Sequence, residues 1–174
     1  FGIFELGMNN SNEIRKLSNL VRPNIAIITN VSEAHIGNFN SIKDVIKAKA
    51  EIFEGIENCG NILINRDFEY YNEVINYSKY LKNIKTITYG INSLSDISLV
   101  KRNIIDGGQI ITALAYEKEY TYKISYDGLH QAINSLAVLG VLLITKSNIQ
   151  KGLNNLHHAI VPIGRGNRHN IIIN

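Results

Sequence analysis

The sequence predicts an α/β fold in which a mostly parallel sheet with helical crossovers is accompanied by a small antiparallel sheet. Over the first ninety residues, short apolar runs alternate with longer segments whose apolar residues recur at helical spacing. Strands that alternate with helices form parallel sheets, because each helix returns the chain to the same edge. Further along, three strand-like segments follow one another with only short turns between them, which predicts antiparallel pairing.

The first half of the chain is expected to contain four strands and three helices. Ser11 is an N-cap residue placed before Ile14, Leu17 and Leu20, which are spaced for one buried helix face. Ser41 and Asp44 form the pattern of a capping box at the start of the next helix. The expected strands are residues 2–6, 25–29, 61–64 and 85–89, and the later helices are residues 41–56 and 70–81.

The second half is expected to add the antiparallel strands and two more helices. Residues 106–108 read Asp-Gly-Gly and residues 117–118 read Glu-Lys, and both suit tight turns between strands. The expected strands are residues 96–105, 109–116 and 119–125, and the expected helices are residues 129–144 and 149–156.

Composition excludes several classes of protein. The net charge of +3 comes from dispersed basic residues without a long basic block, so we expect no nucleic-acid partner. Cys59 is the only cysteine, which excludes an internal disulfide framework and a cysteine-rich zinc site and favours a reducing, cytoplasmic setting. No uninterrupted apolar stretch reaches the ~18 residues of a membrane span, so we expect no membrane insertion. Both ends resemble strands cut from a larger sheet, and we expect a fragment.

Lys49 breaks the pattern of its predicted helix. An unpaired ammonium is costly to bury, so the side chain extends to solvent, has a lowered pKa or has a special partner. A neutral amine could capture carbon dioxide and become a carbamate able to bind a metal ion, which the helical pattern permits. The apolar residues that surround Lys49 on the same face are Ile42, Val45, Ile46, Ile52, Phe53 and Ile56.

Polar residues lie at the carboxyl ends of two predicted strands, where open parallel sheets bind ligands. Glu5 and Asn30 stand at such ends, and His35 is in the loop after the second. Together they could hold a cation or a phosphate. Each also has an ordinary alternative, as a solvated carboxylate, a turn residue and a loop histidine.

Three segments of the sequence resemble the central domain of the Mur ligases. They are ELGMNNSNEI at residues 5–14, TNVSEAHIGNFNSIKDVIKAKAEIF at residues 29–53 and GLHQAINSLAVLG at residues 128–140. The resemblance implies that residues 1–174 form a P-loop-like central domain truncated at its amino end. It would lack its first strand, the phosphate loop and both flanking domains, since no GxxxxGK[ST] segment is present.

The resemblance also implies a metal site built on the residues described above. Glu5 matches a magnesium-binding glutamate, and His35 matches a histidine that helps to hold a second magnesium ion. Lys49 matches a lysine that is carbamylated in these enzymes and supports the second ion. An anionic carbamate suits this hard, oxygen-seeking metal, whereas an ammonium would repel it.

Four further residues would bind ATP if the resemblance holds. Asn30 would shape the loop near the nucleotide phosphates, and Arg165 would reach the phosphates from the end of the domain. His130 and Asn134 share one helix face, and Asn134 matches an asparagine near the adenine. The sequence departs from the family pattern at Gln131, which follows the histidine in place of an asparagine and affects the details of adenine contact.

The implied activity is ATP-dependent amide formation through an acyl phosphate. The motifs are most similar to family members that join D-alanyl-D-alanine to UDP-N-acetylmuramoyl-tripeptide, a step of peptidoglycan precursor synthesis. We therefore expect a monomeric parent ligase that uses ATP and two magnesium ions, and no activity from the 174 residues alone. The alternatives are another Mur or folylpolyglutamate-type ligase, and a noncatalytic nucleotide- or anion-binding module.

Overall fold

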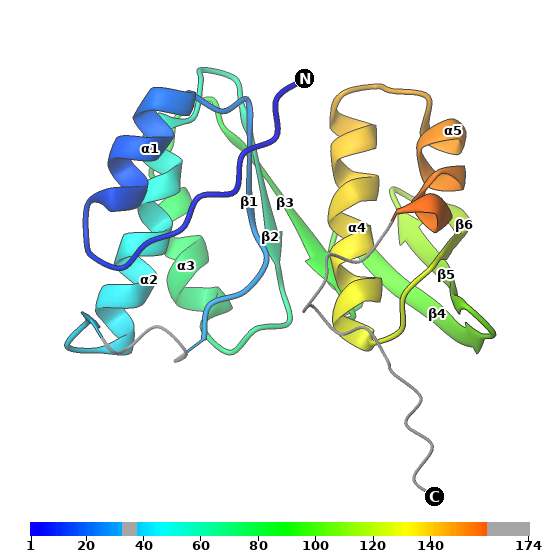
Figure 1. Ribbon diagram of the computed structural model, residues 1–174. Coiled ribbons are helices and arrows are strands. Elements are labelled where there is room, and N and C mark those ends of the chain that lie inside the picture. Colours follow the sequence, from blue (N-terminus) through cyan, green and yellow to red (C-terminus); the bar gives the residue numbers. More distant parts are fainter. Residues whose placement is uncertain (33–37, 160–174) are drawn as a thin grey trace, which may run out of the picture.

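The computed structural model describes residues 1–32 and 38–159, and it places six strands in one continuous sheet (Figure 1). The strand order follows the sequence, with parallel pairing among the first four strands and antiparallel pairing among the last three. The mixed α/β fold class is therefore confirmed, although the antiparallel strands extend the parallel sheet instead of forming a second one. The strands are β1 (Ile25–Ile28), β2 (Asn61–Asn65), β3 (Lys85–Gly90), β4 (Ile97–Ile105), β5 (Gly108–Ala115) and β6 (Lys118–Ile124).

Helices cover both faces of this sheet. Figure 1 shows α1, α2 and α3 on one side of the parallel strands, and α4 and α5 on the side of the antiparallel strands. No helix among the described residues has the length and apolar character needed to cross a bilayer. The helices are α1 (Glu13–Val21), α2 (Ile42–Ala50), α3 (Tyr71–Ser78), α4 (Leu129–Ile144) and α5 (Ile149–Asn154), with short 3₁₀ helices η2 (Glu51–Gly55) and η3 (Leu156–His158).

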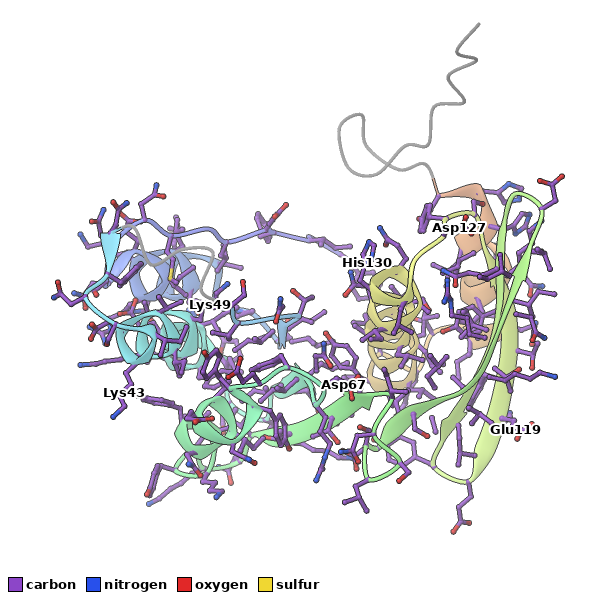
Figure 2. All side chains as sticks on the ribbon, turned by 90° about the horizontal axis from the view of Figure 1, so that it is seen from below. Lys43, Lys49, Asp67, Glu119, Asp127 and His130 are labelled. Carbon is purple, nitrogen blue, oxygen red and sulfur yellow. The ribbon has the colours of Figure 1, made fainter. Side chains whose placement is uncertain are left out.

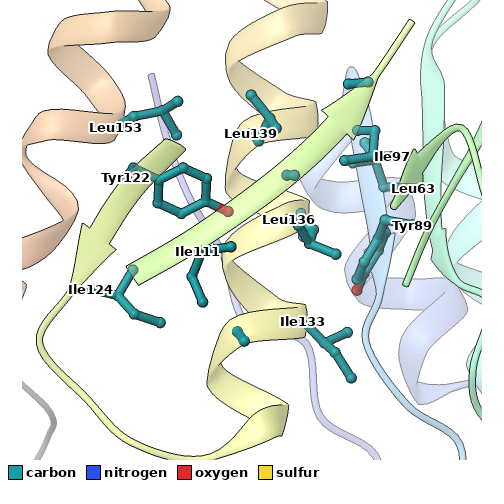
Figure 3. Close-up of a cluster of buried hydrophobic side chains, with 14 of the residues drawn as sticks. Leu63, Tyr89, Ile97, Ile111, Tyr122, Ile124, Ile133, Leu136, Leu139 and Leu153 are labelled. Atoms are coloured by element: carbon teal, nitrogen blue, oxygen red, sulfur yellow. The ribbon is translucent and has the colours of Figure 1, made fainter. Parts of the chain in front are cut away.

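Strand β2 separates two hydrophobic cores. Ile62 and Ile64 point toward α2 and α3, whereas Leu63 points toward α4, and all three are fully buried. Successive residues of a strand face opposite sides of a sheet, so a strand that is covered on both sides needs this unbroken apolar run. The larger core lies between α4 and the antiparallel strands, where Tyr122 and Leu136 are buried (Figure 3).

Three expectations about the amino-terminal region are wrong, the first being Ser11 as the N-cap of its helix, because Asn12 occupies that position. Residues 2–6 do not form a strand, and Ile3 is 98% exposed. A strand requires a neighbour for its backbone hydrogen bonds. The nearest strand in the sequence, β1, is at the edge of the described sheet and pairs only with β2, so it does not pair with residues 2–6. In α1 the buried residues are Ile14 and Ser18, whereas Leu20 is 80% exposed.

The face of α1 that is buried contacts η2. The Ser18 hydroxyl donates to the Ile52 carbonyl oxygen over 2.7 Å, and a Cβ atom added at Gly55 would lie only 2.3 Å from the Ser18 backbone. A small residue on each side is what allows this close approach. The helix expected at residues 41–56 also divides here, because α2 ends at Ala50 and tightens into η2.

Candidate functional site

The carboxyl ends of β1 and β2 are tied together by the side chain of Asn65. Its Nδ2 donates to the Thr29 carbonyl oxygen over 2.9 Å, and its Oδ1 accepts from the Asp67 backbone N–H over 2.9 Å. The Asn65 side chain is buried, and it is the hydrogen-bond partner of both of these backbone groups. Asn65 therefore fixes the backbone immediately before Asn30, which is exposed and begins the loop toward His35.

Tyr89 supports the same strand end from β3. Its hydroxyl donates to the Ile28 carbonyl oxygen over 3.4 Å. Burial, together with the charge of Asp67, raises the pKa of Tyr89, so the phenol keeps its proton and remains a donor at neutral pH. The carbonyl groups of Ile28 and Thr29, at the end of β1, are thus held by side chains from β2 and β3.

Asp67 organises the loop that follows β3 (Figure 2). Its carboxylate accepts from the Ile91 N–H over 2.6 Å and from the Asn92 N–H over 3.0 Å. Gly90 has a φ of +155°, and a Cβ atom at that position would lie 2.4 Å from Asp67 Oδ2. Glycine is required because the backbone passes directly over the carboxylate.

Lys49 lies half-buried on α2, as its position on an apolar face predicts (Figure 2). Burial lowers the pKa of its ammonium group. The ion pairs found in the part of the chain that the structure describes are Arg15–Glu54 and Arg22–Glu57, and neither includes Lys49. Lys43 on the same helix is exposed. A partly desolvated amine that pairs with no carboxylate of residues 1–32 or 38–159 is suited to chemistry that removes its positive charge.

Glu5 lies exposed in the segment that leads to α1, and the loop after it is tightly turned. The Glu13 carboxylate accepts from the backbone N–H groups of Asn9 and Asn10 and from the Asn10 side chain. The Asn10 side-chain hydrogen bond and the two backbone hydrogen bonds lower the pKa of Glu13. A second carboxylate, that of Glu51, holds the start of α1 from outside that helix.

His130 and Asn134 share an exposed face near the start of α4, as predicted. The loop before this helix is held by Gln109, whose Nε2 donates to the carbonyl oxygens of Tyr126 at 2.7 Å and Gly128 at 3.1 Å. Gln109 is fully buried, and its Oε1 accepts from Arg102. Sequence reasoning missed this role, and the available signal was a glutamine at a position of β5 that alternation assigns to the buried face.

Two of the expected site residues lie outside the described residues, namely His35 of the metal site and Arg165 of the ATP site. Within residues 1–32 and 38–159, no group of three His, Cys, Asp or Glu side chains is arranged to hold a metal ion. The oxygen donors in question are the carboxylate of Glu5 and, if it forms, the carbamate of Lys49. Such donors fit Mg²⁺, which prefers hard oxygen ligands and keeps several of its waters.

Comparison with known proteins gives consistent results. The sequence model of one protein family, the Mur ligase middle domain, matches residues 1–142 of this chain. UDP-N-acetylmuramoyl-tripeptide–D-alanyl-D-alanine ligase of Rickettsia prowazekii is 30% identical over 171 residues, which cover 98% of this chain and 38% of that protein. The enzyme of the same name from Escherichia coli is 28% identical over 160 residues, covering 90% of this chain and 35% of that protein. The chain therefore spans well under half the length of these relatives.

Solved structures show the same fold. A crystal structure of MurF from Acinetobacter baumannii superposes with a TM-score of 0.84 at 22% identity, covering 94% of this chain and 35% of that one. MurF ligase from Thermotoga maritima in complex with ADP superposes with a TM-score of 0.76 at 23% identity, covering 91% of this chain and 36% of that one.

Proposed function

Because the chain belongs to the Mur ligase family through its middle domain, we propose that it is part of an ATP-dependent ligase that joins D-alanyl-D-alanine to UDP-N-acetylmuramoyl-tripeptide. The names of its relatives support this substrate pair. The parent protein would act as a monomer in the cytoplasm, in peptidoglycan precursor synthesis. The isolated 174 residues would be inactive, since they cover only 38% of the length of the Rickettsia relative.

The observation that carries the proposal is the half-buried Lys49, whose ammonium pKa is lowered by desolvation. Its neutral amine would add to carbon dioxide, forming an N–C bond and releasing one proton to solvent. The product is a carbamate that carries a negative charge where the lysine carried a positive one. This reversal of charge makes α2 a source of metal-binding oxygen atoms.

The remaining site residues would take complementary roles. Glu5 would bind one Mg²⁺ ion, and His35 with the carbamate of Lys49 would bind a second. Bound Mg²⁺ lowers the repulsion between the substrate carboxylate and the ATP phosphates. Asn30 would shape the loop beside those phosphates, and Arg165 would add fixed positive charge to them.

The adenine would lie along the exposed face of α4 that carries His130 and Asn134. Buried Gln109 would keep this face in place by holding the carbonyl groups of the preceding loop. The antiparallel strands would therefore serve the nucleotide site by supporting the start of α4.

The test is the substitution Lys49→Ala in the full-length protein, with ligase activity measured as ADP release that depends on both substrates. We expect a loss of at least ~100-fold, the size of effect seen when one group that stabilises transition-state charge is removed. Added short carboxylates should restore part of the activity by replacing the carbamate. Lys43→Ala, an exposed lysine of the same helix, is the matched control and should keep full activity. Full activity of Lys49→Ala would overturn the proposal.

A further inference from the structure

Glu51 is a buried carboxylate that begins η2, directly after α2. Glu51 is only 3% exposed. Burying a carboxylate is costly unless hydrogen bonds compensate for lost water. Here the compensation comes from α1, because Glu51 Oε1 accepts from the Asn12 N–H over 2.9 Å and Oε2 accepts from the Arg15 N–H over 3.1 Å.

The Arg15 N–H is at the third position of α1, where the N-cap side chain normally accepts, and the Asn12 N–H is that of the N-cap residue, which the side chain at the third position normally satisfies. Asn12 occupies the N-cap position of α1, but it has a φ of +70° and makes no side-chain cap hydrogen bond. Glu51, which is 36 residues away from Arg15 in the sequence, supplies the missing acceptor. The negative charge also lies at the positive end of the helix dipole, which favours the arrangement.

The capped end of α1 is connected to the segment that carries Glu5. The turn at residues 9–12, folded around the Glu13 carboxylate, is all that separates that segment from α1. On the other side, Lys49 stands two residues before Glu51 in the same run of helical backbone. A single carboxylate therefore ties together the two chain segments that supply Glu5 and Lys49.

We propose that Glu51 is a positioning residue, which holds the turn at residues 9–12 and the Glu5 segment at a fixed place relative to Lys49. This role presupposes the proposed magnesium site. It makes a distinct prediction, because loss of the cap should weaken Mg²⁺ binding without removing any group that contacts the metal ion.

Glu54 is the matched control on the same short helix. Its carboxylate pairs with the Arg15 side chain at 2.6 Å and 2.8 Å, and both side chains are substantially exposed. It contacts the same helix as Glu51 but receives no backbone N–H group of α1. An exposed ion pair of this kind contributes little to stability.

The experiment compares Glu51→Ala, Glu51→Gln and Glu54→Gln in the full-length protein. Ligase activity is measured over a range of Mg²⁺ concentrations, and hydrogen exchange is measured for the backbone amides of residues 9–15. Residues that orient metal ligands typically change metal affinity by about 10–100-fold when mutated. We expect Glu51→Ala to raise the half-saturating Mg²⁺ concentration at least tenfold, with kcat largely recovered at saturating Mg²⁺ and with faster exchange at residues 9–15.

The other two variants make the result interpretable. Glu51→Gln keeps one acceptor oxygen and should show a smaller shift of the same kind, so it decides the question if Glu51→Ala does not fold. Glu54→Gln should stay within twofold of the unmodified protein in Mg²⁺ dependence. An unchanged Mg²⁺ requirement together with faster exchange would reduce Glu51 to a purely structural role and overturn the inference. In that case an inactive Lys49→Ala variant would still support the proposed function.

Discussion

The buried pair Tyr122 and Ser135 gives the sharpest test of the packing between β6 and α4 (Figure 3 shows Tyr122 in this core). The two hydroxyl oxygens are 2.8 Å apart, and both residues are buried. Ser135 Oγ also lies 2.6 Å from the Ala132 carbonyl oxygen, which accepts its only proton. The Tyr122 hydroxyl must therefore be the donor between the two side chains.

This direction of donation predicts that Tyr122→Phe changes the free energy of unfolding differently when residue 135 is serine and when it is alanine. In the unmodified chain, Tyr122→Phe removes one hydrogen bond without leaving a buried donor unpaired, and it should lower the free energy of unfolding by about 1 kcal/mol. In the Ser135→Ala background the Tyr122 hydroxyl has already lost its acceptor, and its desolvation costs about 1–3 kcal/mol. There Tyr122→Phe should be neutral or stabilising.

The assay is urea-induced unfolding of the 174-residue chain at pH 7, followed by far-UV circular dichroism, for the two single variants and the double variant. The comparison of backgrounds cancels the higher helix propensity of alanine at position 135. An equal cost of Tyr122→Phe in both backgrounds would show that the two hydroxyl groups do not interact, and would refute the reasoning.

The same tyrosine predicts a loss of stability at high pH. Burial raises the pKa of Tyr122 to about 12, above the ~10 of an exposed tyrosine. A folded-state pKa above the unfolded value gives stability that is complete below pH ~10 and is lost as the pH rises toward 12. Two pKa units correspond to about 3 kcal/mol. Tyr122→Phe should lose less stability between pH 8 and pH 11, and parallel losses would contradict this account.

Substitutions at two further positions test the contacts that position the site. Gly55→Ala should lower the free energy of unfolding by about 1–3 kcal/mol, because its Cβ atom would lie 2.3 Å from the Ser18 backbone. Urea unfolding measures the effect, with Gly7→Ala as control, because Gly7 is exposed and a Cβ atom there would meet nothing within 4 Å. Wild-type stability would mean that α1 and η2 are not in such close contact. Asn65→Ala leaves the Thr29 carbonyl and the Asp67 N–H without their partner, so we expect it to lower the free energy of unfolding by about 2–3 kcal/mol in the same assay. Asn65→Asp should also be destabilising, because a carboxylate cannot donate to the Thr29 carbonyl.

The parallel strands and α4 could be predicted from sequence because burial on both sides leaves a simple pattern. β2 is an unbroken apolar run, and α4 is apolar over four turns, so both were located within one residue. Residues 2–6 have the same apolar character but do not form a strand in the structure. Composition indicates which segments suit a strand, but a strand exists only where another segment accepts its hydrogen bonds.

Lys49 was found because it violates a helical pattern, whereas Glu51 was missed because it obeys one. A glutamate on the polar side of an amphipathic helix normally faces water. That side is covered here by α1, a contact that depends on Ser18 and Gly55 being small and not on any apolar stripe. Periodicity detects the face that meets a hydrophobic core, and it cannot detect a second face buried through small and polar residues.

Asn65, Gln109 and Glu51 act by the same physical principle. Each is buried, and each binds backbone groups at the end of a strand, in the loop before a helix or at a helix N-terminus. Such ends expose N–H and C=O groups that regular structure leaves unpaired, and they are also the points from which functional loops start. A side chain that satisfies them fixes the position of the loop as well as the stability of the element. Loss of any of these three residues should therefore alter the binding of ATP or magnesium at the proposed site, through the position of the loops and not through direct contact with the ligand.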